Sequence, residues 1–226
     1  MIKQKEKTKK LDVFWLRLTY TCNNSCIFCL DYENQKDENE KFITLRQIKK
    51  NIERVRNKSN KKIVLSGGEP TLHPQVLDVI KYAKKQGFAK IQLISNGRMF
   101  YYKKFLNEII KSGIDEITIS FHSHIPSIYE ELTDVKGSYL QALQGFKNLL
   151  KLNARLKNKI IINIDIVINK LNLSHIKETI LFFAKHGIYE FDLLSVMPFG
   201  RAMINKDILF FEYPEKNVGY ILVYNF

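Results

Sequence analysis

The chain has 226 residues, of which 45% are hydrophobic and 26% are charged, so it can bury a sizeable core within one domain. Its formal net charge of +13 is compatible with an anionic partner, although much of the excess lies in an N-terminal tail and in lysine pairs typical of solvated helix surfaces. The charged N-terminus and the absence of any run near the roughly 18 apolar residues of a membrane span predict a cytoplasmic protein that does not bind the membrane. No DNA partner is expected.

Residues 1–10 are predicted to be a disordered basic leader, and residues 11–203 to form the core domain. The aromatic and aliphatic residues from Val13 to Tyr20 predict a first strand. All cysteines of the chain follow this strand within one short loop. They are Cys22, Cys26 and Cys29.

Thiolate sulfur is a soft ligand, so three closely spaced cysteines favour an iron–sulfur cluster or zinc over magnesium or calcium. A four-iron cluster held here would keep one iron without a cysteine ligand, because the sequence has no fourth cysteine. That iron would be open to a substrate or cofactor. The alternatives are a disulfide that leaves one thiol over and a closed zinc site completed by His73, His122 or His124.

Beyond an amphipathic helix that begins after Thr44, the chain repeats a unit of apolar strand, polar or glycine-containing loop, and helix. The further strands are predicted at 62–66, 90–95, 116–121, 159–168 and 189–196. The further helices are predicted near 74–86, 101–112, 138–153 and 174–186, with a longer loop before the third of these. This alternation predicts an α/β fold with a parallel sheet, and the six strands suit a partial (β/α)6 TIM-like barrel.

Parallel barrels carry their functional residues at the carboxyl ends of the strands, and every unusual loop of this chain follows a strand. Besides the cysteines, these loops are Gly67 to Pro70, Asn96-Gly97, Ser120 to His124 and Met197-Pro198. We therefore expect all of them at one mouth of the barrel.

The turn Gly67-Gly68-Glu69-Pro70 allows two interpretations. Its glycines permit close approach of a ligand to the backbone, Pro70 fixes the direction in which the chain leaves, and carbonyl groups with Glu69 can accept an ammonium group. An ordinary connection between a strand and a helix is the alternative.

The cysteine spacing, with Phe28 directly before the third cysteine and Gly67 to Pro70 one β/α unit later, resembles the radical S-adenosylmethionine (radical SAM) superfamily over residues 12–200. The resemblance implies that the three cysteines bind a [4Fe-4S] cluster and that SAM chelates its fourth iron. It also implies the cofactor contacts. These are Phe28 near the adenine, Gly67, Gly68 and Glu69 with Pro70 in the turn that receives the methionyl amino group, Asn96 and Ser120 at the carboxylate or ribose, and Met197 as an apolar wall for the adenine.

The implied reaction is the reductive cleavage of SAM to a 5′-deoxyadenosyl radical, which abstracts hydrogen from an unidentified substrate. Reduced ferredoxin or flavodoxin is the implied electron donor. A peptide, protein or small-molecule substrate is favoured, and RNA remains open. The alternative is a catalytically inactive or partial iron–sulfur or SAM-binding partner subunit.

Four further residues are candidates without an assigned role. His122 and His124 are either proton donors or substrate contacts, or hydrogen-bonded loop histidines. Asp165 interrupts an apolar strand and is either a contact facing the barrel interior or a buried, capped carboxylate. Arg201 either clamps a carboxylate or phosphate, or is solvated.

The segment 204–226 is predicted to be a short C-terminal β extension. Ile208 to Tyr213 and Val218 to Tyr224 would pair as a hairpin or add to the sheet edge, unless the segment is the remnant of a longer gene product. No cysteine follows Cys29, so this chain offers no cysteine ligands for a second cluster.

Overall fold

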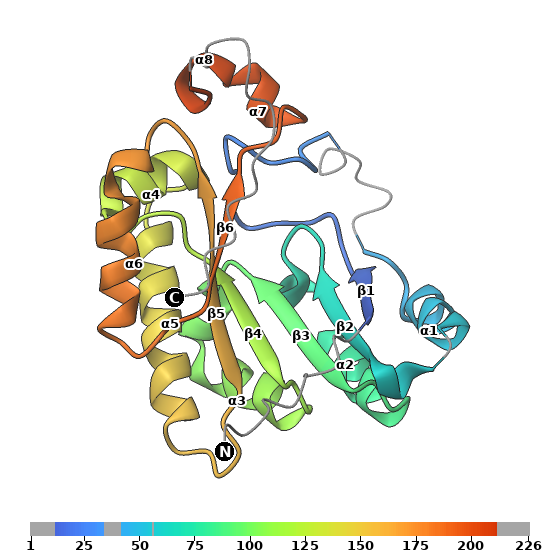
Figure 1. Ribbon diagram of the computed structural model, residues 1–226. Helices are drawn as coiled ribbons and strands as arrows, with labels where there is room; N and C mark the ends of the chain where they lie inside the picture. The colour runs from blue at the N-terminus through green and yellow to red at the C-terminus, as the bar shows by residue number, and fades with distance from the viewer. Residues whose placement is uncertain (1–11, 34–41, 56, 212–226) are drawn as a thin grey trace, which may run out of the picture.

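The computed structural model describes residues 12–33, 42–55 and 57–211. Six parallel strands form one sheet in the order β1-β2-β3-β4-β5-β6, so each strand pairs with the next strand of the chain (Figure 1). The strands are β1 (Asp12–Arg17), β2 (Lys61–Ser66), β3 (Lys90–Ser95), β4 (Glu116–Ser120), β5 (Ile161–Ile168) and β6 (Phe191–Ser195). The sheet curls into a half-barrel, which confirms the predicted α/β fold and partial TIM-like barrel.

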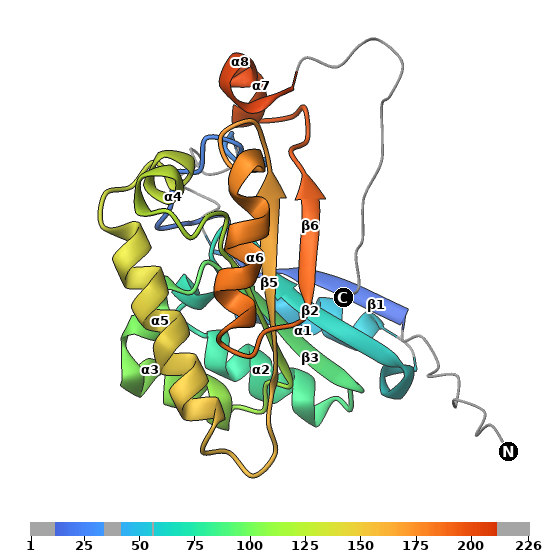
Figure 2. The same ribbon diagram turned by 60° about the vertical axis from the view of Figure 1, so that its left-hand side comes forward.

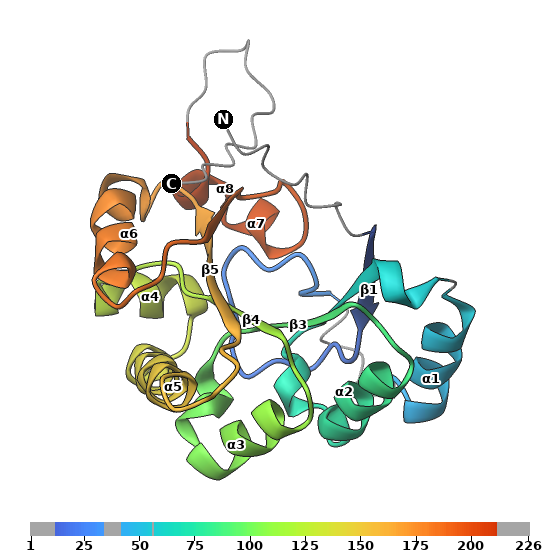
Figure 3. The same ribbon diagram turned by 60° about the horizontal axis from the view of Figure 1, so that its bottom comes forward.

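The helices between the strands cover the outer face of the sheet, and Figure 3 shows them outside the arc that the strands make. They are α1 (Leu45–Arg54), α2 (Val76–Lys85), α3 (Lys103–Lys111), α4 (Pro126–Thr133), α5 (Ser138–Asn153) and α6 (Ile176–Ala184). Two short helices, α7 (Arg201–Ile204) and α8 (Lys206–Leu209), lie beyond the end of β6 (Figure 2). Across the described residues, no helix combines the length and the apolar character needed to cross a membrane.

Helix α1 shows how local sequence sets an element. The Thr44 side chain accepts a hydrogen bond from the Gln47 N–H at 3.3 Å, which satisfies one of the free donors at the start of the helix and confirms the predicted cap. Ile48 and Ile52, one turn apart, are fully buried. The helix ends at Arg54, and the next residue, Val55, has an extended backbone.

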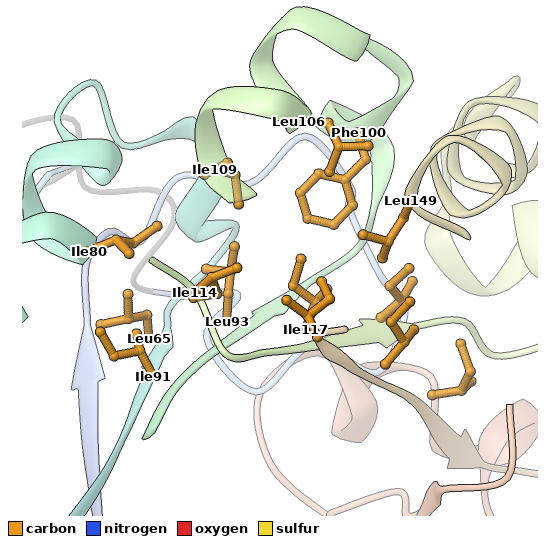
Figure 4. Packing of buried hydrophobic residues seen from close by; sticks show 14 of the residues in the cluster. Leu65, Ile80, Ile91, Leu93, Phe100, Leu106, Ile109, Ile114, Ile117 and Leu149 are labelled. Atoms are coloured by element: carbon orange, nitrogen blue, oxygen red, sulfur yellow. The ribbon is translucent and has the colours of Figure 1, made fainter. Parts of the chain in front are cut away.

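The core lies between the outer face of the sheet and the helices (Figure 4). Leu65, Leu93 and Ile117 stand side by side in the strand register and are completely buried. Helices supply the opposite wall, with Ile109 from α3 and Leu149 from α5 among the packed side chains. Burying apolar surface contributes roughly 25 cal/mol per Å², so this layer is the main source of stability.

The inner face of the same strands carries polar side chains. Lys62 of β2 forms an ion pair with Glu116 of β4 at 2.8 Å, and Asn163 of β5 donates to the same carboxylate at 2.9 Å. Gln92 of β3 donates a hydrogen bond to Thr118, two residues after Glu116 in β4, at 2.6 Å. These bonds tie neighbouring strands together and satisfy polar groups that would otherwise be costly to bury.

Two predicted segments differ from the structure. The longer loop expected before α5 contains helix α4, which starts with Pro126 at its first turn and ends where Asp134 adopts a left-handed backbone. The β extension expected from Ile208 is wrong in the described part, because α8 runs through that residue and buries Leu209. The leader 1–10 and the segment Val218 to Tyr224 lie outside the described residues.

Candidate functional site

A cavity of about 430 Å³ opens at the carboxyl ends of the strands. The cysteine loop (residues 22–29) crosses it inside the arc of the sheet, where Figure 3 shows the blue segment after β1. The structure brings nearly all of the predicted contact residues to this cavity. Its lining includes Cys22, Cys26, Phe28, Cys29, Gly67, Gly68, Glu69, Asn96, Ser120 and Met197. Pro70 is the exception, since it begins a short 3-10 helix (Pro70–Leu72) behind the turn.

The two glycines of the turn are packed against the chain itself. The N–H of Gly68 donates to the Thr19 carbonyl at 2.8 Å. A Cβ on Gly67 would lie 2.4 Å from that Thr19 oxygen, and a Cβ on Gly68 would lie 2.4 Å from the Tyr20 oxygen. We expected these glycines to make room for a ligand, whereas the structure shows that they first make room for the segment leading into the cysteine loop.

Glu69 joins the ends of β2 and β3. Its side chain is 1% exposed and accepts hydrogen bonds from the N–H and hydroxyl of Thr71, from the Ser95 hydroxyl at 2.9 Å and from the Asn96 N–H at 2.7 Å. Burial raises the pKa of this carboxyl group, while those hydrogen bonds oppose the rise. The contact of Glu69 with the amino group of SAM stays a prediction. The structure adds that its neighbours hold the Glu69 side chain in one position.

The thiols of Cys22 and Cys26 are shielded from solvent, which disfavours their charged form. Burial, followed by the negative charge of Glu69, raises the pKa of Cys22 to about 12. Burial, followed by the charges of Cys22 and Cys29, raises the pKa of Cys26 well above the usual thiol range. Thiols of this kind stay protonated until a metal replaces the proton and compensates the charge. The soft donor set therefore fits an iron–sulfur cluster.

Two of the three histidine candidates for a zinc site form hydrogen bonds elsewhere, and only His122 lines the cavity with the cysteines. Both ring nitrogens of His73 are occupied, by the Ile43 carbonyl at 2.8 Å and by the Gln75 N–H at 3.1 Å. His124 Nδ1 is paired with the Thr179 hydroxyl at 2.9 Å. Within the described part of the chain, no three His, Cys, Asp or Glu side chains are arranged to hold a metal ion. Cluster-binding thiolates do not need to converge in this way, because each binds a different iron.

His122 and His124 point to different places. His122 is 5% exposed, lines the cavity and packs edge-on against Phe28, with ring centroids 4.8 Å apart. Its Nδ1 accepts the Val167 N–H at 3.2 Å, so the neutral ring carries its proton on Nε2. Burial lowers the pKa of His122 to about 4, which keeps the ring neutral near pH 7. His124 matches the interpretation of a hydrogen-bonded loop histidine.

Asp165 faces the interior of the half-barrel and lines the cavity. It stands between Ser120 and Asp192 in the strand register and is 8% exposed. Burial, then the charge of Asp192 and a hydrogen bond with it, raises the pKa of Asp165 well above the usual range. Asp165 is therefore a weakly ionised carboxyl group at the cavity wall.

Arg201 is neither solvated nor free to clamp a ligand. Its guanidinium donates to the carbonyl and hydroxyl of Ser25 and pairs with Asp134 at 2.7 Å. The sequence analysis missed two residues with the same kind of role, Arg98 and Asn205. Arg98 directly follows Asn96-Gly97 at a strand end, which is the signal that could have identified it.

A family comparison decides the class of this protein. The model of the radical SAM superfamily matches residues 16–183, which is most of the chain and includes the cysteine loop and the glycine turn. The chain belongs to the radical SAM superfamily. Members of this enzyme family use a [4Fe-4S] cluster and SAM and need an electron donor.

Curated relatives within the superfamily are longer than this chain. The chain is 27% identical over 200 residues to a probable GTP 3′,8-cyclase of Sulfurisphaera tokodaii, covering 88% of this chain and 59% of that relative. It is 26% identical over 193 residues to a protein of the same name from Sulfolobus acidocaldarius, covering 85% of this chain and 58% of the relative. The chain therefore spans less than two thirds of the length of these relatives.

Solved radical SAM structures share the fold at low identity. HydG, a maturase of the [FeFe]-hydrogenase, superimposes with a TM-score of 0.68 at 14% identity, covering 88% of this chain and 46% of HydG. The enzyme anSMEcpe with bound AdoMet superimposes with a TM-score of 0.62 at 16% identity, covering 83% of this chain and 53% of that enzyme. These similarities support the half-barrel architecture.

Proposed function

We propose that this chain is a radical SAM enzyme that cleaves SAM reductively and uses the product to abstract hydrogen from a substrate. The observation that carries the proposal is the convergence of the cysteine loop and the Gly67 to Glu69 turn on one cavity. Helix α1 and strand β2 separate these two segments in sequence, and their meeting supports the proposal of a cluster site beside a polar turn. The proposed cluster ligands are Cys22, Cys26 and Cys29.

Each part of the cavity has a role in this proposal. The cofactors, when bound, supply the 5′-deoxyadenosyl radical, and the protein positions the reactants and limits access of water. Gly67, Gly68 and Glu69 present main-chain groups and a fixed carboxylate to the amino group of SAM. Phe28 and Met197 offer apolar surface to the adenine, while Asn96 and Ser120 offer hydrogen bonds to its polar parts.

Anaerobic reconstitution tests this function. The purified chain is loaded with iron and sulfide, bound iron is counted, and 5′-deoxyadenosine is measured after addition of SAM and a strong reductant. We expect about four irons per chain and formation of 5′-deoxyadenosine. Cys26→Ala should do neither, whereas Ser127→Ala, at an exposed position of α4, should match the wild type.

Two outcomes would contradict the proposal. Tightly bound zinc in place of iron would reject the cluster. A loaded chain that binds SAM but forms no 5′-deoxyadenosine would favour the alternative function, an inactive partner subunit that binds the cluster or SAM.

The cavity favours a neutral substrate, such as an uncharged part of a peptide or a small molecule. Of the carboxyl groups in its described lining, Asp31 is ion-paired with Arg17 at 2.7 Å, and burial raises the pKa of Glu69 and of Asp165. The same lining contains no Lys or Arg. The triphosphate of GTP or the backbone of RNA would meet no cation there. We therefore expect GTP to leave the rate of 5′-deoxyadenosine formation unchanged. Consumption of GTP with a matching rise in 5′-deoxyadenosine would assign the reaction named for the curated relatives instead.

Reduced ferredoxin or flavodoxin is the proposed electron donor. Both are commonly acidic, and the net charge of +13 favours encounter with an acidic partner. The proposed location is the cytoplasm, where thiols stay reduced. Reduction of the cluster by such a donor, weakened by added salt, would support this assignment.

A further inference from the structure

Arg98 holds one side of the cysteine loop. Its Nη1 donates to the Asn23 carbonyl and, at 2.8 Å, to the Asn24 side chain, while its Nε donates to Gln141 of α5 at 2.7 Å. Asn96 adds a bond of 2.7 Å to the Asn23 side chain. In the described part of the chain Arg98 forms no ion pair, so its charge is not offset by a neighbouring carboxylate.

Arg201 holds the opposite side of the same loop. Its side chain binds the Ser25 carbonyl and hydroxyl, and its backbone N–H donates to the Cys29 carbonyl at 2.9 Å. The ion pair with Asp134 offsets part of its charge. A Cβ on the preceding Gly200 would lie 2.4 Å from the Cys29 carbonyl oxygen, so the two segments are in direct contact.

We propose that Arg98 and Arg201 form an arginine clamp, a pair of positioning residues that fixes the cysteine loop from both sides and raises the reduction potential of the cluster bound there. The inference rests on the proposed function, because it requires the cluster. Neither arginine lines the cavity, so the pair acts through the loop and not by contact with SAM or substrate.

The physical basis is charge. Each thiolate adds a negative charge to the site, and uptake of one electron from the donor adds another. A guanidinium held near the loop stabilises the more negative, reduced form, and its hydrogen bonds restrict the loop that carries the thiolates.

The two arginines should contribute unequally to the potential. The charge of Arg201 is shared with Asp134, whereas Arg98 binds neutral groups. Arg98 should therefore have the larger effect on the potential. Both should slow the loss of iron, because each fixes backbone carbonyls of the loop.

The test compares Arg98→Gln, Arg98→Lys and Arg201→Gln with the wild-type protein, and uses Arg155→Gln, an exposed arginine after α5, as the control. The midpoint potential of the reconstituted cluster is measured by a redox titration followed by electron paramagnetic resonance. The rate of iron release to a chelator is measured in the same samples. Neither readout depends on turnover.

We expect Arg98→Gln to shift the potential to more negative values, and Arg201→Gln to shift it less. Arg98→Lys keeps the charge but lacks the guanidinium fork, so it should retain the wild-type potential. All three variants should release iron about tenfold faster than the wild type, the scale usual for loss of groups that support metal ligands. Arg155→Gln should change neither quantity.

The inference is overturned if Arg98→Gln has the potential and the iron-release rate of Arg155→Gln. If Arg98→Gln does not fold, as judged by circular dichroism, Arg201→Gln is compared with Arg155→Gln instead, by the same two measurements. Failure of the wild-type protein to hold a cluster is a different result, which rejects the proposed function and not the clamp alone.

Discussion

The two faces of the half-barrel sheet have opposite chemistry although the same strands make both. In β4, Ile117 and Ile119 face the helices and are completely buried, whereas Glu116 and Thr118 face the interior and are tied into polar contacts. The outer face is a continuous layer of aliphatic side chains (Figure 4). The inner face carries an ion pair, amide side chains and the cavity.

The outer face of the sheet contributes to the stability of the fold, whereas the inner face carries the residues of the candidate site. Side chains alternate along a strand, so a single substitution changes one face and leaves the other in place. Changes on the outer face should lower stability without changing what the cavity binds. Changes at the inner mouth should affect loading of the cofactors first. Three substitutions test this division.

Gly68→Ala should have the largest effect. The new Cβ would meet the carbonyl oxygens of Tyr20 and Thr21 at 2.4 and 2.5 Å, and both are backbone atoms that cannot turn away. The turn and the cysteine loop must therefore separate, and we expect bound iron after reconstitution to fall below a tenth of the wild-type value. Gly87→Ala is the matched control, since its Cβ meets nothing within 4 Å. Full iron loading of Gly68→Ala would contradict the packing argument.

Ile117→Ala should lower the free energy of unfolding by about 3 kcal/mol, because it removes buried methyl groups and leaves a cavity in the core. Urea denaturation of the chain measures the loss. The iron content of the folded variant should equal that of the wild type. Leu140→Ala removes a side chain that is 69% exposed and should cost less than about 0.5 kcal/mol. If Ile117→Ala and Leu140→Ala lowered the free energy of unfolding by similar amounts, the buried outer face would not be the main source of stability.

His122→Gln should change how stability depends on pH. The pKa of His122 is about 4 in the folded chain against 6.5 when exposed, so the unfolded chain binds the proton more tightly and stability falls as the pH drops through this interval. The wild type should lose about 2 kcal/mol from this group between pH 7 and pH 5. The variant should lack that part of the decrease. Parallel curves for the two proteins would show that His122 is not buried as described.

Much of the fold was predictable because the outer face follows regular periodicities. The sequence places β3 at Lys90–Ser95 and α5 at Ser138–Asn153, the bounds that the structure has. Short amphipathic segments were not predictable in the same way. Helix α4 has only eight residues, and α8 leads into a short apolar run, residues 208–211, that equally suits a strand. What decides α8 is the burial of Leu209 against residues far away in the chain.

The sequence predicted which loops form the site, but not the hydrogen bonds that hold those loops in place. Parallel strands bring their carboxyl ends to one edge, so the cysteines and the glycine turn were expected to meet. Arg98, Arg201 and Asn205 each donate to a backbone carbonyl of the cysteine loop, and such an acceptor leaves no residue pattern in the sequence. For the same reason Glu69 was predicted as a ligand contact, while its bonds to Ser95 and Asn96 were not foreseen.

The bonds from α7 and its end to the cysteine loop join residues that lie 176 and 178 positions apart. During synthesis the cysteines leave the ribosome long before Arg201 and Asn205 do. At 5–20 residues per second this delay is roughly 10–35 s. Throughout that interval the loop lacks the hydrogen bonds from Arg201 and Asn205. The cysteine loop therefore gains its last contacts only after nearly all of the half-barrel has been synthesised.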